Sequence, residues 1–357
     1  MKVLLLGEFS GFYLNLKQGL QEIGVDVTLA ANGDGWKKIE GADRELYRTE
    51  DKNLIKKLYF EMIEPVLKAN DFSGYDVVSM VNSKIFYPQI NSYIFNRLKA
   101  NNASVFISSA GSTYSLYKAW KENKIGYYIY DDNPESTKIY ESNGLKAQMQ
   151  RKTETYVERN ADGIIPIMYE YAVGIRNNKN CRKTIPIPFD ASKVKYHENK
   201  VRDKIVFFHG LLREKDKGTQ YIREAFDIIK RKYPNDVECI MAGGLPLNEY
   251  LDVLGRTNVL VDQCKEHCWG LNACYAMAEG KVVLGGASRN SLKEFGLTET
   301  PVKHIGPSVE QIVCQMERLI EERQEIEKYG YESRKFVETF HNHIEIAQQY
   351  VEEWRRE

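Results

Sequence analysis

The chain has 357 residues, of which 43% are hydrophobic and 28% charged, and its 50 basic side chains balance 50 acidic ones. This length and composition are typical of a folded globular protein of two domains and exclude a largely disordered chain. A net charge of zero gives no general attraction to nucleic acid, so we expect no nucleic-acid partner.

No apolar run approaches the ~20 residues that span a bilayer. The apolar start at residues 2–7 predicts a first β-strand, because it is too short for a signal peptide. Six cysteines without a secretory signal predict reduced thiols and a cytoplasmic protein.

The first half of the chain alternates predicted strands and helices. We expect strands at 2–7, 25–30, 76–81, 104–108, 125–130 and 163–167, and helices at 14–23, 88–100 and 145–160. This order is typical of a doubly wound α/β domain, which we place at residues 1–190. The turn around Gly7 and Gly11 lacks the G-x-G-x-x-G pattern, so we expect no dinucleotide cofactor.

Residues 53–68 form a predicted lysine-rich amphipathic helix, with Leu54, Leu58, Met62 and Val66 on one stripe. One interpretation is a surface helix whose apolar stripe packs on the sheet. The other is peripheral contact with an anionic membrane surface. The two glutamates within the helix dilute its basic face and favour the first interpretation.

The second half restarts after a polar linker at 190–203. Strands are predicted at 204–208, 237–241, 259–261, 281–284 and 302–305, with a helix at 218–230. They indicate a second α/β domain over residues 191–335. Apolar residues from Val337 to Trp354 recur at steps of three and four, so we expect one helix over 336–357 that returns to the first domain. His341 and His343 are expected on its surface, with no metal role.

Two loops of the second domain fit anion binding. Arg213 and Lys217 lie beside a predicted helix start, where the helix dipole and free backbone amides favour negative charge. Gly270 and Leu271 precede another helix start, so their amides are placed to meet a phosphate or sugar hydroxyls. His209, at the end of a strand, either bonds a ligand or is a packed turn residue.

Two further groups leave alternatives open. Cys264, His267, Cys268 and Cys274 invite a zinc site, but their spacing matches no common ligand set, so we expect buried thiols and no metal. Several of the 23 tyrosines lie between residues 114 and 130. They either line a sugar-binding groove by stacking or belong to the core and surface.

The sequence resembles a known family over nearly its whole length. The motifs are Arg213-x-x-x-Lys217-Gly218-Thr219, Val261-Asp262-Gln263 and Gly270-x-Asn272-Ala273-x-x-Ala276-Met277-Ala278-x-Gly280-Lys281-x-Val283. They look like the GT-B glycosyltransferases, and most like the retaining, glycogen-synthase-like (group 1) branch that builds bacterial surface polysaccharides. The opening residues 2–29 and the tail from Gly330 to His341 are also similar.

The resemblance implies two Rossmann-like domains facing across a cleft, with a C-terminal helix crossing back to the first domain. It implies a hexosyl transfer from a UDP- or GDP-sugar to a glycan or lipid-linked glycan, with retention, without a metal and without a cofactor. The enzyme is expected in the cytoplasm or peripherally at the inner face of the membrane.

The resemblance and the local patterns together suggest these roles. Arg213, Lys217, Gly270, Leu271 and Gly11 hold the donor phosphates; Tyr275, Asn272, Trp269 and Glu266 contact the nucleotide or sugar; His209 and His267 are catalytic; and Ser10, Gly111 and Ser112 lie on the acceptor side. The family has glutamates where this chain has His267 and Tyr275. The alternative is therefore a non-catalytic GT-B subunit that binds a glycan or a partner enzyme. An epimerase or a phosphorylase has less support.

Overall fold

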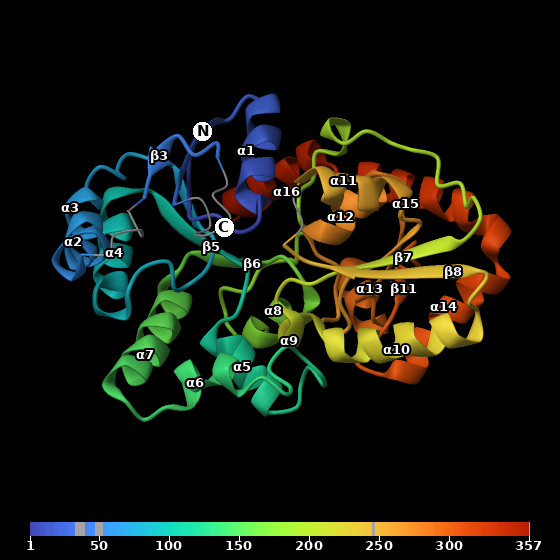
Figure 1. Ribbon diagram of the computed structural model, residues 1–357. Coiled ribbons are helices and arrows are strands. Elements are labelled where there is room, and N and C mark those ends of the chain that lie inside the picture. Colours follow the sequence, from blue (N-terminus) through green and yellow to red (C-terminus); the bar gives the residue numbers. More distant parts are fainter. Residues whose placement is uncertain (33–39, 47–52, 245–246, 357) are drawn as a thin grey trace. The chain divides into compact units, whose positions relative to one another are not determined.

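The computed structural model describes residues 1–32, 40–46, 53–244 and 247–356. The chain divides into two compact units, each built on its own parallel sheet, as expected for two α/β domains (Figure 1). The first unit comprises Met1–Lys124, Thr137–Pro188 and His343–Glu357. The second comprises Ile125–Ser136 and Phe189–Asn342.

The first unit has a six-stranded sheet in the order β3-β2-β1-β4-β5-β6. Its strands are β1 (Lys2–Leu6), β2 (Asp26–Ala31), β3 (Arg44–Glu45), β4 (Val77–Met80), β5 (Ser104–Ser109) and β6 (Gly163–Pro166). All neighbouring strands are parallel. β1 reads as an almost continuous apolar run because parallel strands are covered on both faces.

The helices of the first unit connect these strands, and the last one comes from the C-terminal end of the chain. They are α1 (Phe12–Glu22), α2 (Leu54–Leu58), the π-helix η2 (Tyr59–Ile63), α3 (Glu64–Lys68), α4 (Pro88–Asn101), α5 (Tyr114–Lys121), α6 (Pro134–Glu141), α7 (Leu145–Asn160), α8 (Tyr169–Ile175) and α16 (His343–Arg355). As expected, the C-terminal helix α16 lies in the first unit, packed on α1. A Cβ at Gly19 of α1 would lie 2.1 Å from the carbonyl oxygen of His343, so only glycine allows this contact.

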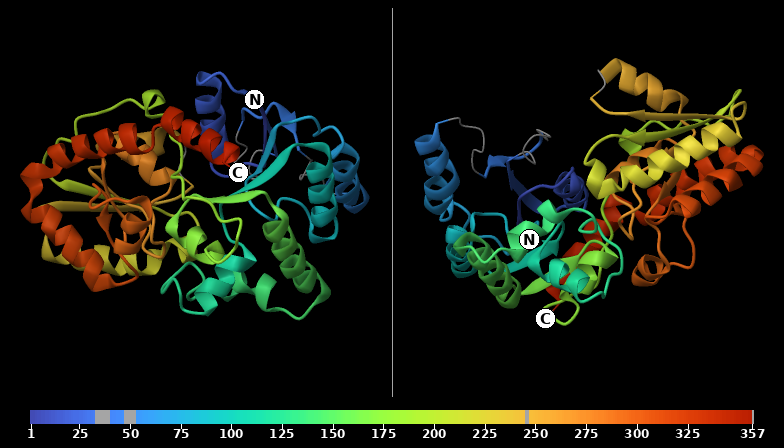
Figure 2. Two further views of the ribbon diagram at one scale, coloured as in Figure 1. Left: turned by 180° about the vertical axis from the view of Figure 1, so that it is seen from behind. Right: turned by 60° about the horizontal axis from the view of Figure 1, so that its bottom comes forward.

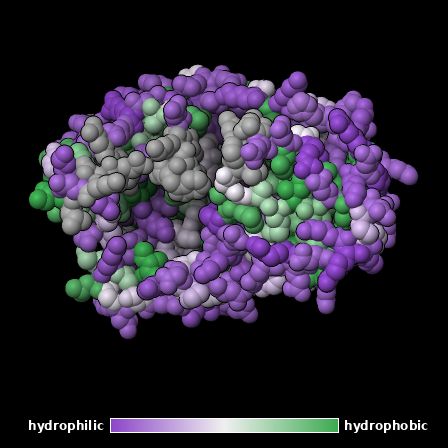
Figure 3. Space-filling model, in the orientation of Figure 1, coloured by the Kyte–Doolittle hydropathy of each residue, from purple (hydrophilic) through white to green (hydrophobic). Residues whose placement is uncertain are grey.

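The second unit has a five-stranded parallel sheet in the order β11-β10-β9-β7-β8. Its strands are β7 (Ile205–Gly210), β8 (Val237–Ala242), β9 (Val259–Val261), β10 (Val282–Gly285) and β11 (Lys303–His304). Its helices are η3 (Ala191–Lys193), α9 (Glu214–Lys217), α10 (Thr219–Lys232), α11 (Leu247–Arg256), α12 (Leu271–Ala278), α13 (Arg289–Phe295), α14 (Val309–Glu321), η4 (Arg323–Glu325) and α15 (Ile326–Phe340). Helices α10 and α14 cover one face of this sheet, and α11 and α12 cover the other (Figures 1 and 2). The edge strand β8 is only partly buried, and apolar surface is visible over it in Figure 3.

Three expectations about the elements are wrong. Residues 125–130 form turns rather than a strand, and they cluster with the second unit. The tail is two helices, α15 and α16, which are separated at His341 and Asn342. His341 and His343 are 2% and 8% exposed rather than on the surface, because His341 accepts a hydrogen bond from Trp269 and His343 bonds Glu22 of α1.

The apolar stripe expected along residues 53–68 is only partly inward. Val66 packs against the core of the first unit, whereas the Leu58 side chain is 58% exposed. The reason is the π-helical turn η2, whose wider spacing rotates the residues before it relative to those after it. The prediction that the whole stripe packs on the sheet is therefore wrong. The side chain of Leu54 lies outside the described residues.

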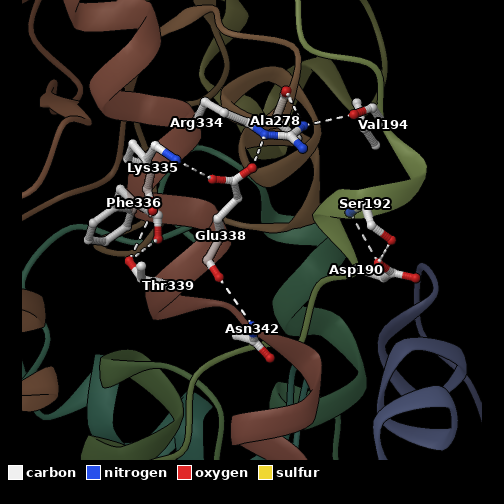
Figure 4. A network of polar contacts seen from close by, with 10 residues as sticks. All are labelled: Asp190, Ser192, Val194, Ala278, Arg334, Lys335, Phe336, Glu338, Thr339 and Asn342. Atoms are coloured by element: carbon white, nitrogen blue, oxygen red, sulfur yellow. Dashed lines mark hydrogen bonds and ion pairs between the residues drawn. The ribbon is translucent and has the colours of Figure 1, made fainter. Parts of the chain in front are cut away.

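Helix α12 is held in place from α15. The Arg334 guanidinium donates to the Ala278 carbonyl at 2.7 Å and to the Val194 carbonyl at 2.7 Å, and it pairs with Glu338 (Figure 4). Ala278 is the last residue of α12, where a cation is favourable because the carbonyls of the final turn lack helical partners. A Cβ at Gly330 would lie 2.1 Å from the Gly280 carbonyl oxygen, so α15 approaches the end of α12 very closely.

Candidate functional site

The carboxyl ends of β7, β8, β9 and β10 form one edge of the second sheet, because these strands are parallel. The loops that leave this edge carry most of the site residues that the sequence predicts. In open α/β sheets, ligands bind at this edge.

A pocket of about 190 Å³ opens at this edge. Strands supply Phe208 and Leu260, and the loop after β8 supplies Gly243 and Gly244. Helix α12 and the residue that caps it present one face to the pocket, formed by Asn272, Tyr275, Ala276 and the cap residue Glu279. These positions are three and four residues apart, which places them on one side of a helix.

Lys217 lines the same pocket and is held by a buried carboxylate. Its Nζ lies 2.9 Å from Asp262 Oδ1, which also accepts a hydrogen bond from Asn272 Nδ2 at 2.7 Å. Burial raises the pKa of Asp262, but Lys217 and Asn272 outweigh this effect and hold it below its usual range. The structure therefore brings together Lys217, Asn272 and Tyr275 of the predicted site.

Arg213 stands at the start of α9 with its side chain exposed. Its φ of 52° lies in the left-handed region, which costs a non-glycine residue on the order of 1–3 kcal/mol. The guanidinium forms no ion pair with any residue that the structure describes. Within the described part of the chain it is thus an unpaired cation, four residues before Lys217.

His209 lies on β7 and is fully buried. Its Nδ1 lies 2.7 Å from the Val261 carbonyl and its Nε2 lies 2.8 Å from the Thr219 hydroxyl. A carbonyl only accepts, so Nδ1–H donates to it and Nε2 accepts from the hydroxyl. Burial lowers the pKa of His209 to about 4, so the ring is neutral at pH 7. Both ring nitrogens bind the protein itself, and His209 does not line the pocket.

His267 is 5% exposed and lies against the segment Ile125–Ser136. Its ring stacks on Tyr127 with centroids 4.3 Å apart, and its Nε2 lies 3.1 Å from the Tyr127 carbonyl. Lys265 supports the same contact by donating to the Asp131 carbonyl at 2.6 Å. The predicted catalytic histidine is therefore packed within the second unit rather than placed in the pocket.

Two residues near His267 in the sequence, Trp269 and Glu266, also contact the protein itself. Trp269 is 3% exposed within a cluster of aromatic rings, and its indole N–H donates to His341 at 2.7 Å. The members of the cluster are Phe295, Phe336, Phe340 and His341. The Glu266 carboxylate accepts a hydrogen bond from Gln263. Neither Trp269 nor Glu266 lines the pocket.

Gly270 and Leu271 lie at the start of α12, as expected. Gly270 has an extended backbone and its carbonyl accepts the first helical bond, from Cys274 N at 3.2 Å. Cys264, Cys268 and Cys274 are buried, as predicted. Burial raises the pKa of Cys264 to about 12. No group of three or more His, Cys, Asp or Glu side chains is arranged for a metal within the described ranges.

The predicted loop residues of the first unit lie at the carboxyl ends of β1 and β5. Ser10, Gly11 and Gly111 have positive φ values, and the Ser112 carbonyl accepts from the Tyr140 hydroxyl at 3.4 Å. Glu8 is a buried residue that the sequence did not single out. Its carboxylate accepts from the amides of Gly11 at 2.9 Å and Leu14 at 2.8 Å, so it occupies the amide that was expected to meet the donor phosphates.

Glu279 is the other residue that the sequence analysis did not place in the site. It lies one helical turn after Tyr275, a spacing that is visible in the sequence once the helix is assigned. The contact of Tyr127 with His267 has no such signal, because 140 residues separate the two in the chain.

Comparisons with known proteins define the fold class. Neither a protein-family model nor a curated protein sequence matches the chain. Solved structures do match over nearly its whole length, and they show that the chain has the GT-B fold.

Three of these structures are informative. Sucrose-phosphate synthase from Thermosynechococcus elongatus has a TM-score of 0.64 at 16% identity, covering 99% of this chain and 98% of that chain. HepE from Anabaena, in complex with UDP and glucose, has a TM-score of 0.62 at 12% identity, covering 99% of both chains. UDP-GlcNAc 2-epimerase from Neisseria meningitidis, bound to UDP-GlcNAc, has a TM-score of 0.55 at 12% identity and also covers 99% of both chains.

Proposed function

We propose that the chain is a glycosyltransferase that moves a sugar from a UDP- or GDP-sugar to a glycan or lipid-linked glycan. The observation that carries the proposal is the pocket at the carboxyl edge of the second sheet, where Lys217, Asn272 and Tyr275 meet. The pocket of about 190 Å³ is smaller than the roughly 300–1,000 Å³ of a typical ligand site, so it suits the nucleoside part of a donor. HepE in complex with UDP-glucose has the same fold, which supports this donor class.

The reaction breaks the bond between the donor sugar and the diphosphate, and negative charge builds up on the departing diphosphate. Fixed cations at that point stabilise the transition state. Lys217 has three N–H donors and uses one for Asp262, so two remain for phosphate oxygens. Exposed Arg213 adds a group able to bind phosphate through two N–H bonds. We assign the transfer to these cations without a metal, and with retention of the anomeric configuration as the resemblance implies.

Glu279 supplies the carboxylate that the family pattern places one turn earlier. It lines the pocket on the same helix face as Tyr275. A carboxylate accepts two hydrogen bonds from neighbouring hydroxyls, as the two hydroxyls of a ribose require. We therefore assign the ribose to Glu279 and a ring contact with the base to Tyr275, whose side chain is 49% exposed.

Calorimetric titration with UDP and with GDP tests the proposal. We expect the chain to bind one of them, and Glu279→Gln and Arg213→Ala each to weaken that binding about tenfold, which corresponds to ~1.4 kcal/mol. The control is Glu321→Gln, which removes an exposed carboxylate on α14 and should leave the affinity unchanged. If neither nucleotide binds the unmodified chain, the proposal is wrong.

A non-catalytic glycan-binding subunit is the second candidate, favoured by one observation. His267 stands where the family has a sugar-binding glutamate, and it is covered by Tyr127. Release of free UDP or GDP from nucleotide sugars separates the two candidates. Nucleotide binding without any release, in the presence of glycan acceptors, would favour the non-catalytic subunit.

Peripheral contact with the inner face of the membrane is part of the proposal. None of the helices, within the part of the chain that is described, has the length and apolarity to cross a membrane. However, Ile55, Leu58, Ile63 and Leu67 of α2–α3 are between 47% and 80% exposed, and Lys56 and Lys57 lie between them in the sequence. Exposed apolar side chains beside lysines suit an anionic lipid surface. Six free cysteines support a reducing, cytoplasmic compartment.

A further inference from the structure

The first unit contains a groove that the proposed donor site does not use. A cavity of about 650 Å³ lies among α5, α7 and α8. A second hollow of about 540 Å³ continues along α7 and shares Tyr114, Thr155 and Arg159 with the first. We call the two together the α5–α7 groove (its helices are labelled in Figure 1).

The charges that line the groove are mainly positive. The cations are Lys118, Lys124, Arg151, Lys152, Arg159 and Lys179, and the acids are Glu122 and Glu158. Glu122 is neutralised by Lys124 at 2.6 Å. Among the described residues, Lys152, Arg159 and Lys179 form no ion pair. Uncommitted cations on both sides of one groove favour an anionic ligand.

The floor of the groove is a built polar site rather than a patch of surface lysines. Glu158 is 5% exposed, and its carboxyl group accepts hydrogen bonds from Ser83 at 3.0 Å and from Ser115. The next buried acid on α7, Glu154, accepts from the Tyr114 amide at 2.6 Å and from Gln150 at 2.6 Å. These bonds fix Tyr114 and Ser115 at the wall of the cavity.

The buried acid does not cancel the positive charge at the rim. Burial, together with nearby Glu154, raises the pKa of Glu158 to about 7. Its carboxyl group is therefore partly protonated near neutral pH and carries less than a full negative charge. The groove keeps a net positive field, and a protonated carboxyl group can also donate a hydrogen bond.

The size of the α5–α7 groove and its uncharged side chains indicate which anionic ligands it can bind. Tyr114 and half-exposed Tyr156 offer ring faces and edges, and Asn177 and Asn178 offer amides. Rings and amides bind sugar rings and hydroxyls, and the cations bind carboxylate, sulfate or phosphate groups on them. The two hollows, of about 650 and 540 Å³, are far larger than a single phosphate ion. Tyr114 follows Ser112, a predicted acceptor-side residue, by two positions.

We propose that the α5–α7 groove binds a negatively charged glycan chain, which is the acceptor of the transfer reaction. The role as acceptor rests on the proposed function, whereas binding by the groove does not require it. The binding residues are Tyr114, Ser115, Arg159 and Lys179, with Lys118 and Lys152 completing the cationic rim.

The test is calorimetric titration of the full chain, at physiological ionic strength, with a sulfated heparin-derived oligosaccharide and with a neutral maltooligosaccharide of equal length. We expect the sulfated chain to bind and the neutral chain not to bind. The double variant Arg159→Glu/Lys179→Glu should weaken binding at least tenfold. The control Lys195→Glu/Arg202→Glu changes the net charge equally on the exposed surface of the second unit and should bind as the unmodified chain does.

A second variant separates a built site from general charge attraction. Tyr114→Ala keeps every charge and should still weaken binding several-fold, because it removes a ring from the groove. The proposal is overturned if both charge-reversed double variants lose the same affinity for the sulfated chain, or if Tyr114→Ala binds it as the unmodified chain does. It is also overturned if the neutral chain or a single-stranded oligonucleotide binds as tightly as the sulfated chain. If UDP or GDP binds but the sulfated chain does not, the groove proposal fails alone. If the sulfated chain binds but neither nucleotide does, only the donor proposal is removed.

Discussion

At the scale of single residues, the buried histidine His209 shows how the fold fixes a charge state. Its two ring nitrogens bind a strand carbonyl and a helix hydroxyl, so it ties β7 to β9 and to α10. It does not line the candidate pocket, but it fixes the strand end from which the loop of Arg213 and Lys217 departs.

The pKa of His209 predicts a pH-dependent stability. The folded pKa is about 4, against ~6.5 in the unfolded chain, so the unfolded chain binds more protons between these values. The free energy of unfolding therefore falls as pH is lowered through this range, by ~2 kcal/mol between about pH 7.5 and pH 5. Urea unfolding at the two pH values should show this loss as the difference between the unmodified chain and His209→Gln, which lacks the contribution.

Two controls isolate the effect. His197→Gln removes an exposed histidine and should keep the pH dependence of the unmodified chain. Glu158 acts in the opposite direction, because its raised pKa stabilises the folded state at low pH and that stability is lost as pH rises through about 7. The difference between variants, rather than the total slope, is therefore the measurement. Equal slopes in both histidine variants would contradict the assignment.

At the scale of elements, α12 is the part on which the candidate donor site depends. One face of this helix lines the pocket, its start meets the loop after β9, and its last carbonyl is bound by Arg334. A shift of α12 would move Asn272, Tyr275 and Glu279 together.

We expect Arg334→Ala to weaken both stability and nucleotide binding. The change removes hydrogen bonds from the charged guanidinium to two carbonyls. A hydrogen bond to a charged group contributes roughly 1.5–3 kcal/mol, and we expect the free energy of unfolding to fall by ~2 kcal/mol. Nucleotide affinity should fall several-fold, although Arg334 does not line the pocket. Urea unfolding and UDP or GDP titration measure the two effects.

The matched control is Arg318→Ala. Arg318 pairs with Glu322 at 3.0 Å on the surface of the second unit, where an ion pair contributes only ~0–1 kcal/mol. It should change neither quantity by a measurable amount. Loss of nucleotide affinity in both variants would show that the effect comes from general destabilisation rather than from α12.

At the scale of the whole molecule, the exposed apolar side chains of α2–α3 predict binding to the surface of an anionic membrane. Apolar surface is visible at the edge of the first unit that carries these helices (Figure 3). The chain should sediment with phosphatidylglycerol vesicles and much less with phosphatidylcholine vesicles. Ile55→Ser and Leu67→Ser should each reduce this binding, whereas Tyr331→Ser, which changes an exposed residue of α15, should not. Equal binding to both lipids would remove the electrostatic part of the argument.

The fold could be predicted from the sequence wherever the information is local. Helix α7 was predicted with the bounds that the structure shows, and most strands of the two sheets follow from short apolar runs. The exposed edge strand β3 was not predicted, because Arg44 and Glu45 form no apolar run. The roles of the site residues stay predictions, but the structure does bring Lys217 at the end of α9, and Asn272 and Tyr275 on α12, to one pocket. Prediction failed where a side chain meets a distant part of the chain: Tyr127 covers His267, and His341 takes the N–H of Trp269. The π-helical turn η2 was not predicted for another reason: no residue type marks such a turn in a sequence.

The path of the chain between the two units has a consequence for how the protein is made. The chain passes from one unit to the other after Lys124, Ser136, Pro188 and Asn342. Helix α1 leaves the ribosome long before its partner α16, because the whole of the second unit lies between them in the sequence. Domains usually fold during synthesis in the order in which they emerge. Here the first unit receives its last helix only after residues Phe189–Asn342 of the second unit have been synthesised, so α1 stays without the cover of α16 during that synthesis.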